Sequence, residues 1–117
     1  MGRERSYKIV IARPAKDRYQ NRVLPYIYDN FSFERASKVD EAILQTIETL
    51  QEKPARGRKE KYLEELKEDF RFILHKETKQ FEIKVIYYID QSTKTVYVTD
   101  LFPTKMNPER ISKHHNE

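Results

Sequence analysis

The sequence contains no cysteine among its 117 residues. This absence excludes a disulfide framework, a thiolate zinc site and a cysteine nucleophile. The sequence also lacks a run of the roughly 18 apolar residues that a membrane-spanning helix needs, and the apolar stretch that is typical of a signal peptide. We therefore expect a cytoplasmic protein that makes no use of a membrane.

The residues that are present indicate one small, charge-rich domain. Charged residues make up 36% of the chain, yet eight tyrosines and six phenylalanines supply too many large side chains for a disordered protein. The length admits one compact domain, so we expect residues 1–117 to form a single domain with a core from about 6 to 111 and a tail at 112–117 that frays.

Charge is distributed unevenly along the chain. Residues 1–30 carry seven basic and three acidic side chains, residues 31–69 carry eight and ten, and residues 70–117 carry eight and six. The two ends are therefore basic and the middle is acidic. A basic face backed by an acidic helical layer would give this division, and so would an ordinary surface of ion pairs.

Hydrophobic spacing predicts one strand, two helices and then three strands. Residues 7–12 alternate as a strand, a four-residue stripe from Ala15 to Phe31 predicts a helix with a kink near Pro25, and Ser32 is a suitable cap for a second helix. Residues 55–61 form a basic connection, and residues 62–69 add a helical turn or two. Strands are predicted at 70–76, 81–90 and 95–102. The predicted class is α+β, with order β-α-α-β-β-β and both helices on one face of a small, antiparallel-rich sheet.

Alternation along the last three strands assigns their side chains to two faces. Phe70, Phe72 and Leu74 are predicted to pack against the helices. The opposite, open face is then expected to carry Arg71, Ile73, His75, Lys84, Tyr88 and Tyr97. Such a face can bind nucleic acid, because bases stack on aromatic rings while cations meet phosphates. It can equally be the solvated side of a half-exposed sheet.

Five segments occur in an order that is typical of one known family: YKIVIARPAKD, ILQTIETLQEKPARGR, FRFIL, FEIKVIYYID and VYVTDLFPTKMNPE. The diagnostic combination is a helix ending in Leu-x-x-x-Pro-x-x-Gly, an arginine-led strand, and an Ile-x-Tyr strand that closes on aspartate. From about residue 7 to residue 111 the chain resembles the RelE/ParE superfamily of bacterial type II toxins. The resemblance implies the β-α-α-β-β-β fold and a cognate antitoxin as partner.

The resemblance also implies two alternative activities. One branch of the superfamily cleaves mRNA in the ribosomal A site without a metal, so ribosome and mRNA are its partners, whereas the ParE branch inhibits DNA gyrase. We favour the mRNA endonuclease slightly, and keep the gyrase inhibitor and a degenerate toxin that only binds its antitoxin as alternatives. No cofactor or metal is expected, because the acidic residues are spread along solvated faces.

The resemblance places three basic residues in the candidate site, and the chemistry of imidazole adds a fourth residue. Arg71 and Lys84 match basic positions of the nuclease branch and would neutralise the scissile phosphate, and Lys105 lies near another family arginine. Ile73 departs from the pattern, which has a lysine there. His75 is the candidate for proton transfer, since imidazole titrates near neutrality. Tyr88 or Tyr97 would stack an RNA base or donate a proton.

Each of these residues also has a structural interpretation. Arg71 and Lys84 can form salt bridges across the sheet to Glu82 or Asp90. His75 can be an exposed strand residue near a turn, and Lys105 can belong to a local turn that positions the C-terminal segment against the antitoxin. His114 and His115 are not counted as catalytic. The antitoxin is expected to be a small DNA-binding protein whose flexible segment covers the toxin's helices, which expose Tyr and Phe, or a strand edge.

Overall fold

A computed structural model describes residues 6–115 of the chain. Its centre is a five-stranded mixed sheet with strand order β1-β5-β4-β3-β2. The strands are β1 (Lys8–Ile11), β2 (Arg58–Lys59), β3 (Arg71–Thr78), β4 (Phe81–Asp90) and β5 (Thr95–Pro103). β1 runs parallel to β5, and all other neighbours are antiparallel. The predicted α+β class is confirmed, with the short strand β2 added inside the connection that was predicted to be a basic loop.

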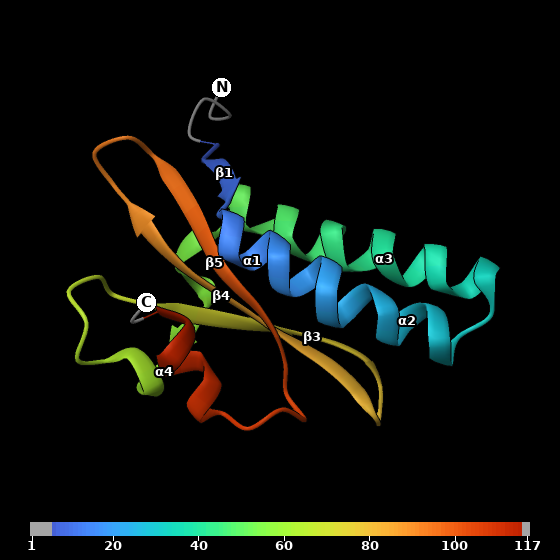
Figure 1. Ribbon diagram of the computed structural model, residues 1–117. Coiled ribbons are helices and arrows are strands. Elements are labelled where there is room, and N and C mark those ends of the chain that lie inside the picture. Colours follow the sequence, from blue (N-terminus) through green and yellow to red (C-terminus); the bar gives the residue numbers. More distant parts are fainter. Residues whose placement is uncertain (1–5, 116–117) are drawn as a thin grey trace.

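The first helical segment is one continuous arm made of α1 (Arg13–Arg18), the π-helical η2 (Tyr19–Val23) and α2 (Leu24–Asn30) (Figure 1). Ala15, Tyr19, Val23 and Ile27 recur every four residues and are all buried. In a regular α-helix this spacing would rotate the stripe by about 40° at each step. The wider π turn takes up the excess rotation, so the stripe stays against the sheet. The prediction was a kink near Pro25, and the structure instead has this π segment, which ends at Val23.

Helix α3 (Phe33–Glu48) returns beside the arm and completes a helical hairpin (Figure 1). As predicted, the Ser32 side chain caps it, because its Oγ accepts a hydrogen bond from the Arg35 backbone N–H at 3.2 Å. Its apolar stripe, which includes Val39, Ile43 and Ile47, is buried against the sheet. The far end of the hairpin projects beyond the sheet. Within residues 6–115, no helix is both long enough and apolar enough to cross a membrane.

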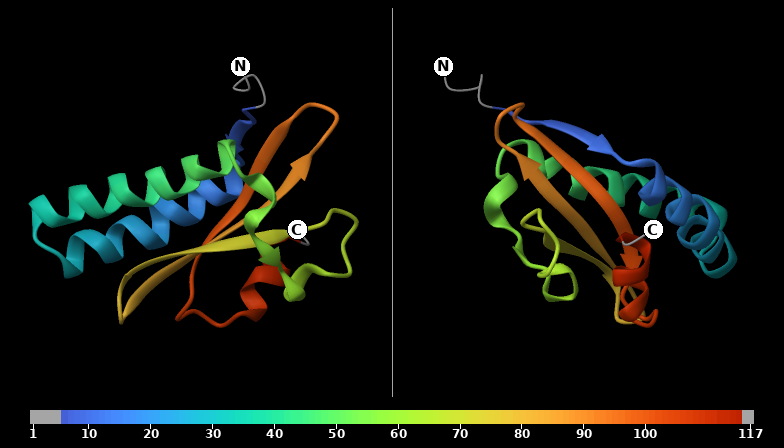
Figure 2. Two further views of the ribbon diagram at one scale, coloured as in Figure 1. Left: turned by 180° about the vertical axis from the view of Figure 1, so that it is seen from behind. Right: turned by 60° about the vertical axis from the view of Figure 1, so that its left-hand side comes forward.

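A second, thinner layer covers the other side of the sheet (Figure 2). The connection from α3 to β3 reaches this layer through η3 (Thr49–Gln51), η4 (Pro54–Arg56) and the edge strand β2. The layer itself consists of η5 (Lys61–Leu63) and helix α4 (Glu109–His115). Leu63, Phe70, Ile86, Phe102 and Ile111 form a small buried core beneath it. The tail that we expected to fray from residue 112 is helical up to His115, and residues 116–117 lie outside the described part.

The register of β3 corrects the predicted face assignment. Arg71, Ile73 and His75 pair with Tyr87, Val85 and Ile83, so they share the face that packs on the helical hairpin. We call this side the hairpin face. Phe72 and Leu74 pair with Ile86 and Lys84 on the opposite side, which we call the far face.

The error in β3 has a physical cause. A shift of one residue turns every side chain of a strand to the other face, and alternation decides between the two only when one face is polar. Here both faces carry a buried core. The run FRFIL supplies Ile73 to one core and Phe72 to the other, so apolar residues occur in both positions of the alternation.

Candidate functional site

Lys84 lies on the far face and is held by a buried carboxylate. Its Nζ is 2.9 Å from Oε1 of Glu60, which is fully buried where η5 begins. Glu60 Oε2 accepts a hydrogen bond from the Tyr62 backbone N–H at 3.1 Å. Oε1 makes no hydrogen bond of good geometry, so the contact with Lys84 is chiefly Coulombic. The ion pair between Lys84 and Glu60 thus holds the connection against the sheet.

Aromatic rings complete the surroundings of Lys84. Its Nζ lies 4.3 Å from the centre of the Phe72 ring, which favours the cation electrostatically. Further along the same face, the rings of Tyr88 and Tyr97 stack at 5.3 Å, and Phe70 meets Tyr88 edge-on at 5.4 Å. Burial raises the pKa of Tyr88, so its hydroxyl is protonated at neutral pH. Lys84, Tyr88 and Tyr97 therefore share one face, as predicted.

Arg71 does not join them, and this corrects the expected site. It lies on the hairpin face, where Nη1 donates to the Gly57 carbonyl at 2.9 Å and Nη2 is 3.3 Å from Asp69 Oδ2. Its carboxylate partner is Asp69, and that of Lys84 is Glu60, so neither cation pairs with Glu82 or Asp90. Because Arg71 and Lys84 point to opposite sides of the sheet, they cannot neutralise the same phosphate.

Tyr87 forms hydrogen bonds to the same stretch of the connection as Arg71. Its hydroxyl donates to the Pro54 carbonyl at 2.5 Å and accepts from the Gly57 N–H at 3.0 Å. Burial raises the pKa of Tyr87, so the phenol remains a donor at neutral pH. Tyr87 and Arg71 therefore bind the backbone on both sides of Gly57, which is a positioning role for the connection.

His75 ties the sheet to α3. Its Nδ1 is 2.7 Å from Thr46 Oγ1, and its Nε2 is 2.9 Å from Glu77 Oε1. Glu77 also accepts from Arg35 at 3.2 Å. Burial would raise the pKa of Glu77, but the hydrogen bonds from His75 and Arg35 outweigh it and lower that pKa. His75 is thus mostly buried between α3 and β3, and not an exposed residue near a turn.

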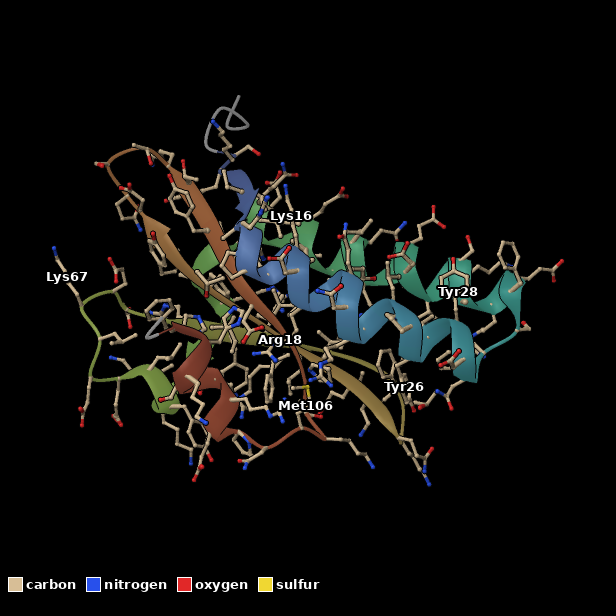
Figure 3. The ribbon with its side chains drawn as sticks, viewed as in Figure 1. Lys16, Arg18, Tyr26, Tyr28, Lys67 and Met106 are labelled. Atoms are coloured by element: carbon tan, nitrogen blue, oxygen red, sulfur yellow. The ribbon has the colours of Figure 1, made fainter. Side chains whose placement is uncertain are left out.

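Lys105 is exposed and lies beyond the end of β5, at the rim of a groove of about 270 Å³. The groove runs between the helical arm and the β3–β4 turn, and its lining includes Arg22, Tyr26, Phe81 and Met106. Tyr26 stacks on Phe81 at 5.0 Å, and Figure 3 shows Tyr26 on the underside of the arm. The floor is therefore apolar, and the charged residues of the lining are Arg22, Lys105 and Glu82.

The projecting end of the helical hairpin exposes aromatic side chains. Phe33 is 77% exposed, and its ring packs against that of Tyr28 at 5.7 Å. Leu44 on α3 is also exposed. Figure 3 shows Tyr28 on the outer side of the arm. Leu44 lies eleven positions after Phe33, so the apolar surface at the projecting end consists of the Tyr28 and Phe33 rings, and exposed rings of this kind are typical of a surface that binds another macromolecule.

Sequence reasoning missed two buried carboxylates, Glu60 and Asp100. Asp100 is fully buried in β5 and forms a bidentate pair with Arg18, at 2.7 Å to Nε and 3.1 Å to Nη2. Glu60 stands in a run of charged residues, where nothing distinguishes it from its solvated neighbours. The sequence did contain one clue to Asp100, because a charged residue inside the apolar run of β5 needs a partner.

The described residues thus define a small α+β protein in which a helical hairpin and a short C-terminal helix enclose a mixed sheet. The family model of the ParE toxin of type II toxin-antitoxin system, parDE, matches residues 9–108. The chain belongs to this toxin family. No curated protein and no solved structure gives a match. Membership in a type II toxin family implies an antitoxin as partner.

Proposed function

We propose that this type II toxin arrests growth by binding DNA gyrase and does not cleave RNA. The observation that carries the proposal is the separation of the two candidate cations. RNA cleavage without a metal needs cations that converge on the charge building on the phosphorane, and groups that move protons beside them. Arg71 lies on the hairpin face, and Lys84 is neutralised by Glu60 on the far face.

The exposed surface of the helical hairpin supports a binding function. Phe33, Tyr28 and Leu44 present apolar groups on an element that projects beyond the sheet. Large aromatic side chains dominate the energy of many protein interfaces. A surface of this kind fits a toxin that acts through contact with a target protein.

One observation favours mRNA cleavage as the second candidate function. Lys84, Tyr88 and Tyr97 share the far face, so one cation and two rings lie on the side where an RNA base would stack. In this alternative Lys105 or His75 would move protons. His75, however, lies on the other face and is bonded to Thr46 and Glu77.

The experiment induces the toxin without its antitoxin and follows two readouts in the same culture. We expect a reporter plasmid to lose negative supercoiling before protein synthesis stops, and purified toxin to inhibit the supercoiling reaction of gyrase. Messages cut at codons within translating ribosomes, while supercoiling is intact, would overturn the proposal in favour of the nuclease. Absence of growth arrest would instead indicate a toxin that retains only antitoxin binding.

A pair of variants separates the two activities further. His75→Gln removes the candidate proton-transfer group but keeps a side chain that can hydrogen-bond to Thr46. We expect this variant to remain toxic, whereas Phe33→Ala, at the exposed end of the hairpin, weakens gyrase inhibition. Loss of toxicity in folded His75→Gln, with Phe33→Ala still fully toxic, would contradict the binding mechanism.

A further inference from the structure

Two shallow hollows lie side by side between the helical arm and α4. Pro14, Asp17, Asn21 and Arg22 line the first, of about 290 Å³, and Arg110 and Lys113 line the second, of about 270 Å³. Arg18 and His114 line both. Figure 3 shows Arg18 between the arm and the C-terminal segment. We call Arg18, Arg22, Arg110, Lys113 and His114 the basic surface.

The basic surface unites the two basic ends of the sequence. Arg18 and Arg22 come from residues 1–30, and Arg110, Lys113 and His114 come from α4. Arg18 and Arg22 stand four residues apart, and Arg110 and Lys113 stand three apart, so each helix carries like charges as neighbours. Such pairs disfavour a helix slightly. The fold brings the two rows together, and their potentials add.

The centre of the basic surface is rigid. Asp100 holds Arg18 through Nε and Nη2, and the guanidinium lies 5.2 Å from the centre of the Phe102 ring. The Nη1 group of Arg18 makes no hydrogen bond to Asp100. His114 is fixed as well, because its Nε2 lies 2.9 Å from the Thr99 carbonyl. A ligand that binds here finds two groups already in place, which reduces the entropy lost on binding.

The rim of the basic surface carries cations without carboxylate partners. Within residues 6–115, Arg22, Arg110 and Lys113 are exposed and form no salt bridge. Exposed lysines elsewhere in the described residues, such as Lys38 and Lys53, form no salt bridge either, so the clustering of its cations distinguishes the basic surface. Asp17 is the one acidic residue among the described residues that line the two hollows. Asp100 is the carboxylate partner of Arg18 and lies near His114, so the three cations at the rim are the part of the surface that favours an added anion.

We propose that the basic surface binds the phosphodiester backbone of duplex DNA. Guanidinium groups match phosphate oxygens in geometry, and a nucleic acid presents such anions at regular intervals. The hollows are shallow and continuous, which suits a chain of phosphates better than one small anion that a pocket would enclose. The choice of DNA over RNA rests on the proposed function, because gyrase acts on duplex DNA.

The test measures binding of the full-length toxin to a labelled duplex of about 20 base pairs by fluorescence anisotropy, at salt from about 50 to 200 mM. The variant Arg22→Glu/Arg110→Glu/Lys113→Glu is compared with the control Lys38→Glu/Lys53→Glu/Lys67→Glu, which changes exposed cations elsewhere by the same net charge. We expect the first variant to bind at least about tenfold more weakly than the control, with a salt slope reduced by about 0.9 for each lost contact. Circular dichroism confirms that both remain folded.

Equal losses in the two variants, or no binding by the wild type, would overturn the proposal. Two further arms use an RNA duplex of the same length and a poly-glutamate peptide. Tighter binding of RNA overturns the choice of DNA, and binding of the peptide alone identifies a surface for an acidic protein. The gyrase assay is independent: a wild type that inhibits gyrase but binds no DNA refutes this inference and leaves the proposed function intact.

Discussion

The two faces of the sheet are covered by different chemistry. The hairpin face packs an aliphatic core in which Ile43, Ile47, Val85 and Val98 are almost completely buried. The far face has a much smaller apolar core and encloses the Glu60–Lys84 pair. A close-packed aliphatic core gains free energy in proportion to its buried area, whereas buried charges contribute only while each keeps its partner. We therefore expect the removal of a single charge to be most destabilising in the far layer.

The largest loss of stability is expected when one charge is removed from the far face, and this tests the difference between the two faces. Lys84→Met leaves Glu60 buried without a counter-charge, and we expect the free energy of unfolding to fall by about 3–5 kcal/mol. Urea denaturation near neutral pH measures the loss. The control is the double variant Glu60→Gln/Lys84→Met, which removes both charges and keeps an acceptor for the Tyr62 N–H. It should recover most of the stability.

A smaller loss is expected at Gly57, where the connection lies close against the sheet. Gly57 has an ordinary backbone conformation, with φ of −75°, so it is needed for space and not for its φ. A Cβ there would clash with the Tyr87 hydroxyl and lie 2.8 Å from the Phe72 carbonyl oxygen. Gly57→Ala should therefore cost about 1–3 kcal/mol, measured by urea denaturation.

The Tyr87→Phe background is the control for Gly57→Ala. Removing the hydroxyl relieves one of the two clashes, so the double variant should lose less than the sum of the two single losses. Additive losses would mean that the Phe72 backbone alone excludes a methyl group. No loss in Gly57→Ala would show that the connection is not held closely against the sheet.

Sequence patterns predicted the hairpin layer well, because its buried residues repeat at the spacing of an α-helix. The stripes through Val23 and Val39 repeat at helical spacing, and Ser32 marks the start of α3 by its own chemistry. The far layer has no such repeat. Its apolar residues come from the connection, the sheet and α4, and only the folded chain brings Leu63 and Ile111 together.

The prediction that Arg71 and Lys84 share one face was wrong for a related reason. A strand between two cores gives no clear alternation, so the face of Arg71 could not be determined from β3 alone. The partner of Lys84 was equally hidden, since Glu60 lies 24 positions earlier in a run of charges. The face shared by Lys84, Tyr88 and Tyr97 was predicted correctly, because the hydrophobic residues of β4 and the core valines of β5 alternate clearly.

The smallest expected effect is a difference between the two faces in the pH range over which each loses stability. His115 in α4 lies on the far face, with Nε2 2.7 Å from Thr99 Oγ1 and Nδ1 2.8 Å from the Ile111 carbonyl. Burial lowers its pKa below 6.5, against the opposing effects of the hydrogen bond to Ile111 and of the Asp100 charge. The folded state thus favours the neutral ring, and unfolding takes up a proton once the pH is below 6.5. Stability therefore falls from that pH downward and stops falling below the folded-state pKa.

The hairpin face titrates in a lower window. The lowered pKa of Glu77 contributes stability above 4.5 that is lost only as the pH falls through its folded-state value. Between about pH 6.5 and 5, the loss should therefore come from the far face, and His115→Gln, which cannot titrate, should reduce it when urea midpoints are compared. The matched control Glu77→Gln should leave this interval unchanged. If Glu77→Gln suppressed the loss and His115→Gln did not, the acid-sensitive contacts would belong to the hairpin face.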